Sequence, residues 1–202
     1  LDHLAVVART LEEGVAYINE ALGIDIPKGG QHPDMGTHNH LMALGPDTYI
    51  EVITADPAAE HPGRPRWFGL DEFDAEPCLG TWIAGTPDIE ASKAASPVDV
   101  GSVLQLSRGT LSWKISVADD GKLPLGGAFP SLIEWPAGGT HPASRMTDLG
   151  CRLTKLHIQS PDAFLIADFL GGALDDAKIE IAQGPHKLSA AFDTPKGERV
   201  LG

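Results

Sequence analysis

The chain opens with LDHLAVVARTLEEGVAYINEALG (residues 1–23), which describes a strand, a capped helix and its end. Residues 1–8 are almost wholly apolar and predict a buried strand. Thr10 is suited to the N-cap of a helix, and Glu13 stands three residues later, as a capping box requires. Gly23 predicts the helix end. The apolar residues between them recur at helical spacing and form one stripe: Leu11, Val15, Ile18 and Leu22.

A similar pattern of strand, helix and strands appears about three times along the chain. The first unit continues with two strands, at 39–45 and 48–55, which GPD links as a hairpin. The pattern restarts near residues 79 and 153, a period of about 75–79 residues. This period exceeds that of solenoid repeats and favours duplicated α+β modules that share a sheet. The later strands are expected at 79–85, 102–108, 110–117, 131–136, 151–159, 177–184 and 187–194, and the helices at 86–96 and after Ser160.

The composition excludes several classes of protein. The chain has 202 residues, 42% of them hydrophobic, which suffices for a core in one or two domains. Its net charge of −13 opposes binding to nucleic acid or to an anionic membrane. No apolar run approaches the roughly 18 residues of a membrane span, and the N-terminus has no signal-peptide pattern. Cys78 and Cys151 are expected to be free thiols of a cytoplasmic protein.

Two strands carry a carboxylate between apolar neighbours. Glu51 lies in TYIEVIT (48–54) and Glu134 in SLIEWP (131–136). In the first strand both faces are largely apolar, so simple exposure to water is disfavoured. A buried carboxylate without a partner costs several kcal/mol or has a raised pKa. A functional role would account for such a carboxylate, and an arginine partner is the ordinary alternative.

Several phrases resemble the vicinal oxygen chelate superfamily, which includes glyoxalase I, extradiol dioxygenases, and fosfomycin-resistance and bleomycin-binding proteins. These phrases are DHLAVVARTLEEGVAYINEALG, THNHLMALG and YIEVI. RWFGLD, LPLGGAFPSLIEWP and HPA make the chain look most like the glyoxalase-like branch.

The resemblance implies an α+β fold of repeated βαβββ modules, in which paired modules curl their sheets around a cavity. Modules at 1–56 and 79–136 would form one domain, 1–136, with a lid-like loop at 57–78 between them. Residues 151–202 would form a partial third βαββ module.

The superfamily places metal ligands on the first and last strands of each module. Carried over to this chain, the resemblance implies a divalent Zn, Ni, Mn or Fe ion held by His3, Glu51 and Glu134, with either glutamate serving as a catalytic base. Module two departs from the pattern. If Asp88 caps its helix, Thr81 stands opposite His3, and if Thr86 does, Leu79 stands there; neither is a strong ligand.

Three further residues are candidates for contact with a substrate. A polar loop edge is the simpler interpretation of His38 and His40, and contact with a substrate is the main alternative, since the two would share one face of a strand. Trp113 is expected in the core or the cavity wall, where it would contact a ligand.

The resemblance supports two functions. The first is metal-dependent lyase, isomerase or dioxygenase-type chemistry on a small oxygenated molecule. The second is metal-free binding of a drug-like or antibiotic-type molecule in the same cavity. Either function implies a small-molecule ligand, and pairing of modules between chains would give a homodimer.

Overall fold

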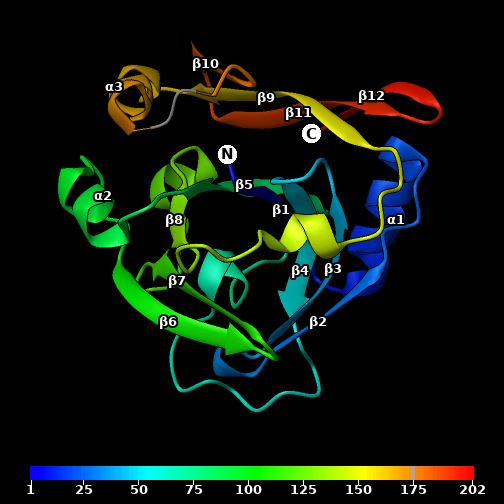
Figure 1. The fold of residues 1–202 in the computed structure, drawn as a ribbon, viewed down its shortest axis with the longest axis horizontal. Helices are drawn as coiled ribbons and strands as arrows, with labels where there is room; N and C mark the ends of the chain where they lie inside the picture. Colours follow the sequence, from blue (N-terminus) through cyan, green and yellow to red (C-terminus); the bar gives the residue numbers. More distant parts are fainter. Residues whose placement is uncertain (174–175) are drawn as a thin grey trace.

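The computed structural model describes residues 1–173 and 176–202. Within them the chain forms two β-sheets and three α-helices (Figure 1). The first βαβββ unit comprises β1 (His3–Val7), α1 (Leu11–Leu22), β2 (Lys28–His32), β3 (Thr37–Ala43) and β4 (Tyr49–Ala55). The second comprises β5 (Cys78–Gly85), α2 (Ile89–Ala95), β6 (Ser102–Arg108), β7 (Leu111–Val117) and β8 (Ser131–Glu134). The remainder comprises β9 (Arg152–Ser160), α3 (Ala163–Ala173), β10 (Ile179–Gln183), β11 (Lys187–Thr194) and β12 (Gly197–Leu201).

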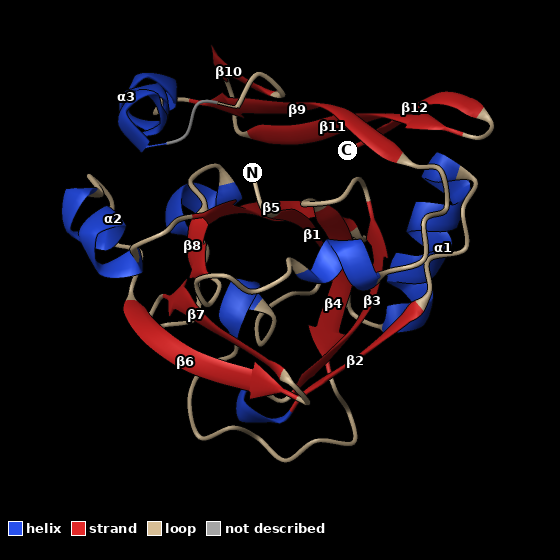
Figure 2. Ribbon diagram, viewed as in Figure 1, coloured by secondary structure: helices blue, strands red, loops and turns tan. Residues whose placement is uncertain are grey.

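The two βαβββ units share one eight-stranded sheet, in the order β2-β3-β4-β1-β5-β8-β7-β6. In each unit the first strand pairs parallel with the last, β1 with β4 and β5 with β8. The units join where β1 pairs antiparallel with β5. The sheet curls until β2 and β6, its two edges, approach each other (Figure 2). The expected α+β fold with a curled sheet is therefore confirmed.

Strand alternation separates the two faces of this sheet. On β1, Leu4 and Val6 point outward and pack with the helices, whereas Ala5 and Val7 point into the curl. The inward cluster also contains Ile53, Ile83, Ile115 and Ile133. The curl is therefore a second apolar core, enclosed by the sheet itself.

The helix caps are those that the sequence indicates. Thr10 accepts the backbone N–H of Glu13 at 3.2 Å, and Gly23 ends α1 in the left-handed conformation with a φ of 68°. In the second unit Asp88, not Thr86, is the N-cap of α2. Matching the two caps makes Thr81 the counterpart of His3.

The third unit lies across the outer face of the first sheet (Figures 1 and 2). Its sheet has the order β10-β9-β11-β12 and shares one apolar core with α1 and the outward side chains of β1. Helix α3 adds Phe169, whose ring lies 5.0 Å from that of Phe129. The first strand, β9, is internal here and pairs with β10 and β11. The strand order thus differs from that of the first two units.

Two strands were not expected from the sequence. β2 (KGGQH) contains two glycines and no apolar residue, and β12 (GERVL) is mostly exposed. Both are edge strands, held by backbone pairing to one neighbour. Edge strands of this kind need no alternation of apolar residues, so the sequence carries no signal for them.

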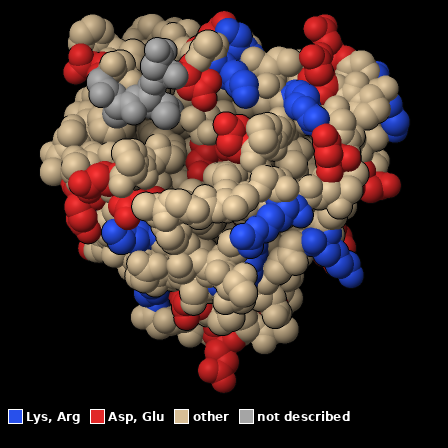
Figure 3. Space-filling view, in the orientation of Figure 1, with Lys and Arg blue, Asp and Glu red and all other residues tan. Residues whose placement is uncertain are grey.

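Other expectations concern the whole chain. Cys78 and Cys151 are both free thiols. None of the helices in the described ranges has the length and apolar character needed to cross a membrane. On the face shown in Figure 3, acidic side chains are spread among basic ones.

A glycine in the turn before β8, packed against β5, tests the packing of the second unit. Gly127 has a φ of 99°, and a Cβ there would lie 2.0 Å from the carbonyl oxygen of Gly80. We expect Gly127→Ala to lower the free energy of unfolding by about 3 kcal/mol or more, measured by urea denaturation, since the clash adds to the backbone cost. Gly138→Ala is the control, because its φ is 73° but a Cβ there would meet no described atom within 4 Å. It should cost about 1 kcal/mol. Equal losses would contradict the packing described.

Candidate functional site

A cavity opens inside the curled sheet, between the two units. Its walls are aromatic and aliphatic side chains, among them Tyr49, Trp113 and Trp135. Its volume is about 40 Å³, which is room for roughly three water molecules. The polar side chains that reach it are His3, Glu51, Asn39, His32 and Arg108.

The segment between β4 and β5 covers part of this cavity. Trp67 and Phe68, in a 3-10 turn at Trp67–Gly69, are buried and line it with stacked rings 5.4 Å apart. Phe68 has a φ of 59°, a conformation that costs a residue with a side chain about 1–2 kcal/mol. A strained residue is thus retained in the cavity wall. The lid role expected for residues 57–78 stays a prediction.

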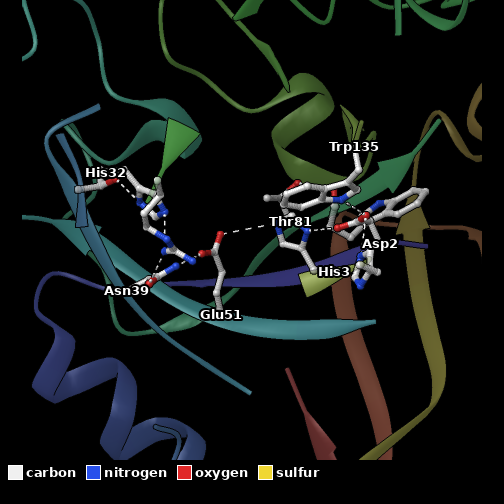
Figure 4. Close-up of polar contacts among 11 residues, drawn as sticks. Asp2, His3, His32, Asn39, Glu51, Thr81 and Trp135 are labelled. Atoms are coloured by element: carbon white, nitrogen blue, oxygen red, sulfur yellow. Dashed lines mark hydrogen bonds and ion pairs between the residues drawn. The ribbon is translucent and has the colours of Figure 1, made fainter. Parts of the chain in front are cut away.

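A chain of three buried ionisable groups runs into the cavity (Figure 4). The Oδ1 of Asp2 lies 2.7 Å from the Nδ1 of His3, and the Nε2 of His3 lies 3.7 Å from the Oε1 of Glu51. Asp2 also accepts hydrogen bonds from Trp135 Nε1 at 2.8 Å and from His141 Nε2 at 3.1 Å. Burial acts to raise the pKa of Asp2, but the hydrogen bonds from His141 and His3 outweigh it and lower that pKa.

The ionised Asp2 fixes the orientation of His3. Since a carboxylate only accepts, the Nδ1 of His3 carries the hydrogen and its Nε2 faces the cavity and Glu51. The ring of Tyr49 stacks on the imidazole at 4.2 Å and holds its plane. An imidazole nitrogen and a carboxylate oxygen, which are the kinds of group that act as general acids and bases, therefore face the same cavity.

Glu51 is held from its other side by an amide. Asn39 Nδ2 donates to Glu51 Oε2 at 2.7 Å, while Asn39 Oδ1 accepts from the backbone of Gly30 at 2.9 Å. Arg108 Nη1 lies 3.5 Å from the same Oδ1. Asn39 thus separates the carboxylate of Glu51 from the guanidinium of Arg108.

His32 is a neutral member of the site. Arg108 Nη1 lies 3.2 Å from His32 Nε2, and because arginine can only donate, this nitrogen accepts. Its Nδ1–H then donates to Thr37 Oγ1 at 3.1 Å. Burial, with the charge of Arg108, lowers the pKa of His32 to about 3.

Of the predicted ligands, the structure brings His3 and Glu51 together but leaves Glu134 apart. Ile133 on β8 and Trp135 directly after this strand both line the cavity, so Glu134 between them points out of the curl, toward α2. Its carboxylate accepts a hydrogen bond from Lys114 Nζ at 2.8 Å and another from the backbone N–H of Ile89 at 2.8 Å. These two bonds lower its pKa. The expectation that Glu134 shares the cavity is corrected on this ground.

Strand register identifies the true counterpart of Glu51. The β1–β4 pairing places Ala5 beside Glu51, and the β5–β8 pairing places Ile83 beside Ser131. The sequence offset that matches His3 with Thr81 also matches Ala5 with Ile83, and therefore Glu51 with Ser131. Where unit one has an imidazole and a carboxylate, unit two has two hydroxyl groups.

His38 and His40 also lie outside the cavity. They alternate on β3 with Asn39, which points inward, so both point to the outer face. His40 Nδ1 lies 2.8 Å from the carbonyl oxygen of Ile26, and His38 Nδ1 lies 3.9 Å from Asp56 Oδ1. The expected contact of these two histidines with a substrate in this cavity is corrected. Trp113 does line the cavity, as expected.

The residues present do not fit a divalent transition metal. Across residues 1–173 and 176–202, no group of three His, Cys, Asp or Glu side chains is arranged to hold a metal ion. A catalytic zinc site uses three protein ligands and one open position. Here His3 and Glu51 are two such donors, and a third is missing because the counterparts of these residues in the second unit are Thr81 and Ser131.

Comparison with known proteins gives a family and a fold. A family model described as "Glyoxalase-like domain" matches residues 1–172. A hypothetical protein from Staphylococcus aureus is similar in structure, with a TM-score of 0.59 and 14% identity over 98% of this chain and 82% of that one. This likeness shows the fold alone. No curated protein matches the chain.

Two weaker structural likenesses were also found. Methylmalonyl-CoA epimerase from Mycobacterium tuberculosis has a TM-score of 0.43 and 18% identity over 67% of this chain and 87% of that one. A glyoxalase I mutant from Zea mays, in which glutamine replaces one glutamate, has a TM-score of 0.29 and 13% identity over 100% and 92%.

His32 should make the stability depend on pH. Its folded pKa of about 3 lies below the ordinary 6.5, so below pH 6.5 the unfolded chain binds a proton that the folded chain does not. The free energy of unfolding should therefore fall as the pH decreases from 6.5 toward 3. Between pH 7.5 and 5.0 this amounts to about 2 kcal/mol. Measured by urea denaturation, the free energy of unfolding of His32→Gln should change by about 2 kcal/mol less than that of the parent chain over this pH range.

The exposed His186 provides the control, since His186→Gln should leave the pH dependence of the parent unchanged. An unaltered pH dependence in His32→Gln would contradict the neutral, buried state assigned to His32.

Proposed function

Because the chain belongs to the glyoxalase-like domain family of the vicinal oxygen chelate superfamily, we propose that its cavity binds a small oxygenated organic molecule and exchanges a proton with it through His3 and Glu51. The single observation that carries this proposal is the buried Asp2–His3–Glu51 chain, whose inner end reaches the cavity.

The cost of these buried groups supports a functional role. Asp2, His3 and Glu51 are each at most 5% exposed. Replacing buried ionisable groups by apolar residues of similar size often leaves the stability of a protein unchanged or raises it. Tyr49, Trp135 and Ile133 surround them, so an apolar packing is available in the same place. Retaining titratable groups in a cavity is typical of sites where protons move.

The geometry suits proton transfer at a carbon next to a carbonyl group. Glu51 or the Nε2 of His3 takes the proton from the carbon, and the electron pair of that C–H bond moves into the carbonyl to give an enolate. The ionised Asp2 stabilises the imidazolium when the proton resides on His3. Return of the proton to the same or the neighbouring atom completes an exchange or an isomerisation. The aromatic walls keep water from the enolate.

No step in this scheme passes through a divalent metal, because His3 and Glu51 are the only imidazole or carboxylate donors among the described residues that line the inner end of the cavity, and their counterparts in the second unit are the hydroxyl residues Thr81 and Ser131. A metal-free binding protein with the same cavity is the second candidate. The aromatic walls favour it, since the ring centroids of Trp113 and Trp135 lie 5.7 Å apart. The two candidates differ in whether a bound molecule exchanges hydrogen with solvent.

Hydrogen exchange in D₂O tests the proposed chemistry. A panel of hydroxyketones and 2-oxo acids is incubated with the protein, and loss of the α-proton signal is followed by NMR. We expect Glu51→Gln to slow the exchange by about 10²-fold or more, since a general base contributes about 10²–10⁴-fold. Glu134→Gln is the matched control, because this carboxylate stands on the other face of the sheet and should leave the rate unchanged. Binding without any exchange would establish the second candidate instead.

Elemental analysis tests the absence of a metal requirement. After dialysis against a chelator, the protein should contain far less than one equivalent of Zn, Ni, Mn or Fe and should keep its exchange activity. One equivalent of metal that disappears in His3→Gln and in Glu51→Gln, but not in Glu134→Gln, would overturn this part of the proposal.

A further inference from the structure

The end of the cavity away from Asp2 has hydrogen-bond donors without partners. Among the described residues, Arg108 forms no ion pair with a carboxylate, and its side-chain hydrogen bonds are with the neutral groups of His32 and Asn39. Both contacts come from Nη1, so Nε and Nη2 have no acceptor in the described part of the protein. The guanidinium thus retains an edge that can receive two oxygen atoms at once.

Trp67 gives a second, independent observation at the same end. It is 4% exposed and lines the cavity, and its Nε1–H is buried without an acceptor in the described residues. Its ring centroid lies 5.2 Å from that of His32, which in turn contacts Arg108. A buried donor left unpaired costs about 1–3 kcal/mol. An acceptor oxygen on a bound molecule would remove this cost.

A surface groove beside Arg108 has the charge that an anion requires. Arg108 lines both the cavity and this groove, whose other members include Lys28, Gln31 and Ser107. None of the described residues that line the groove is acidic, although the chain as a whole has a net charge of −13. Two cations without a carboxylate would favour the approach of an anion at this point.

The neighbouring strand leaves space for the arginine. A Cβ at Gly30 would lie 3.2 Å from the Cδ of Arg108, and one at Gly29 would lie 2.2 Å from the Oδ1 of Asn39. The two glycines of β2 therefore let Arg108 and Asn39 reach their positions across the closing edges of the sheet.

We propose that Arg108 and Trp67 bind the carboxylate of a short-chain oxo carboxylic acid, whose carbonyl end faces His3 and Glu51. This inference rests on the proposed function and adds the class of substrate to it. Arg108 forms two parallel hydrogen bonds with the carboxylate, and Trp67 donates a third. The cavity volume of about 40 Å³ limits the acid to a few heavy atoms beyond the part that Arg108 holds at the groove.

Calorimetric titration with 2-oxobutanoate and with its neutral analogue 2-oxobutanamide tests the proposal. The parent chain should bind the acid about 10- to 100-fold more tightly than the amide, as expected for charged hydrogen bonds. Arg108→Met should abolish this preference. Trp67→Phe, which keeps a ring but removes the N–H, should reduce it by about 5-fold or more. Arg199→Met, which alters an arginine on β12 away from the cavity, should leave the preference unchanged.

Each result has a definite meaning. Equal affinity for the acid and the amide in the parent chain, or a preference that survives both Arg108→Met and Trp67→Phe, overturns the carboxylate site. If Arg108→Met does not fold, Trp67→Phe alone decides. Exchange of the α-protons of neutral hydroxyketones without preference for the acid would leave the proposed proton transfer intact and refute only this inference. Binding of the acid that depends on Arg108 but is not accompanied by exchange would support the carboxylate site and refute the proposed proton transfer.

Discussion

The pairing of β1 with two neighbours is the constraint on which the rest of the structure depends. Its parallel pairing with β4 brings His3 beside Tyr49 and close to Glu51, and its antiparallel pairing with β5 joins the two units into one sheet. Because side chains alternate across a strand, this register decides which groups enter the curl and which face the helices. The cavity and its acid–base pair both follow from it.

The two units have diverged within this common frame. Unit one provides an imidazole and a carboxylate at the positions where unit two has Thr81 and Ser131. The imidazole of His3 and the carboxylate of Glu51 therefore lie on one side of the cavity. On the other side, unit two contributes Arg108 from the end of β6, which crosses to contact His32 and Asn39 of unit one. The cavity thus has one end with His3 and Glu51 and another, cationic end with Arg108.

The sequence predicts the elements that local chemistry determines, and misses what tertiary register determines. The Thr10 cap and the stripe of α1 can be read from residue types and spacing, whereas the inward position of Glu51 was only what the family resemblance implied. Glu134 could not, because SLIEWP resembles TYIEVIT locally, while the β5–β8 register gives its glutamate the opposite face. Asn39 was hidden between two histidines, which are the stronger candidates by residue type. Asp2, His32 and Arg108 acquire their roles only through contacts between distant segments.

A crystal structure of the protein grown with 2-oxobutanoate and Zn²⁺, recorded at the zinc absorption edge, tests the central claim most directly. We expect the acid inside the curled sheet, with its carboxylate on Arg108 and its oxo end beside His3 and Glu51, and no anomalous peak between these two side chains. A zinc ion bound by His3 Nε2 and Glu51 Oε1, or an acid bound only outside the cavity, would contradict it.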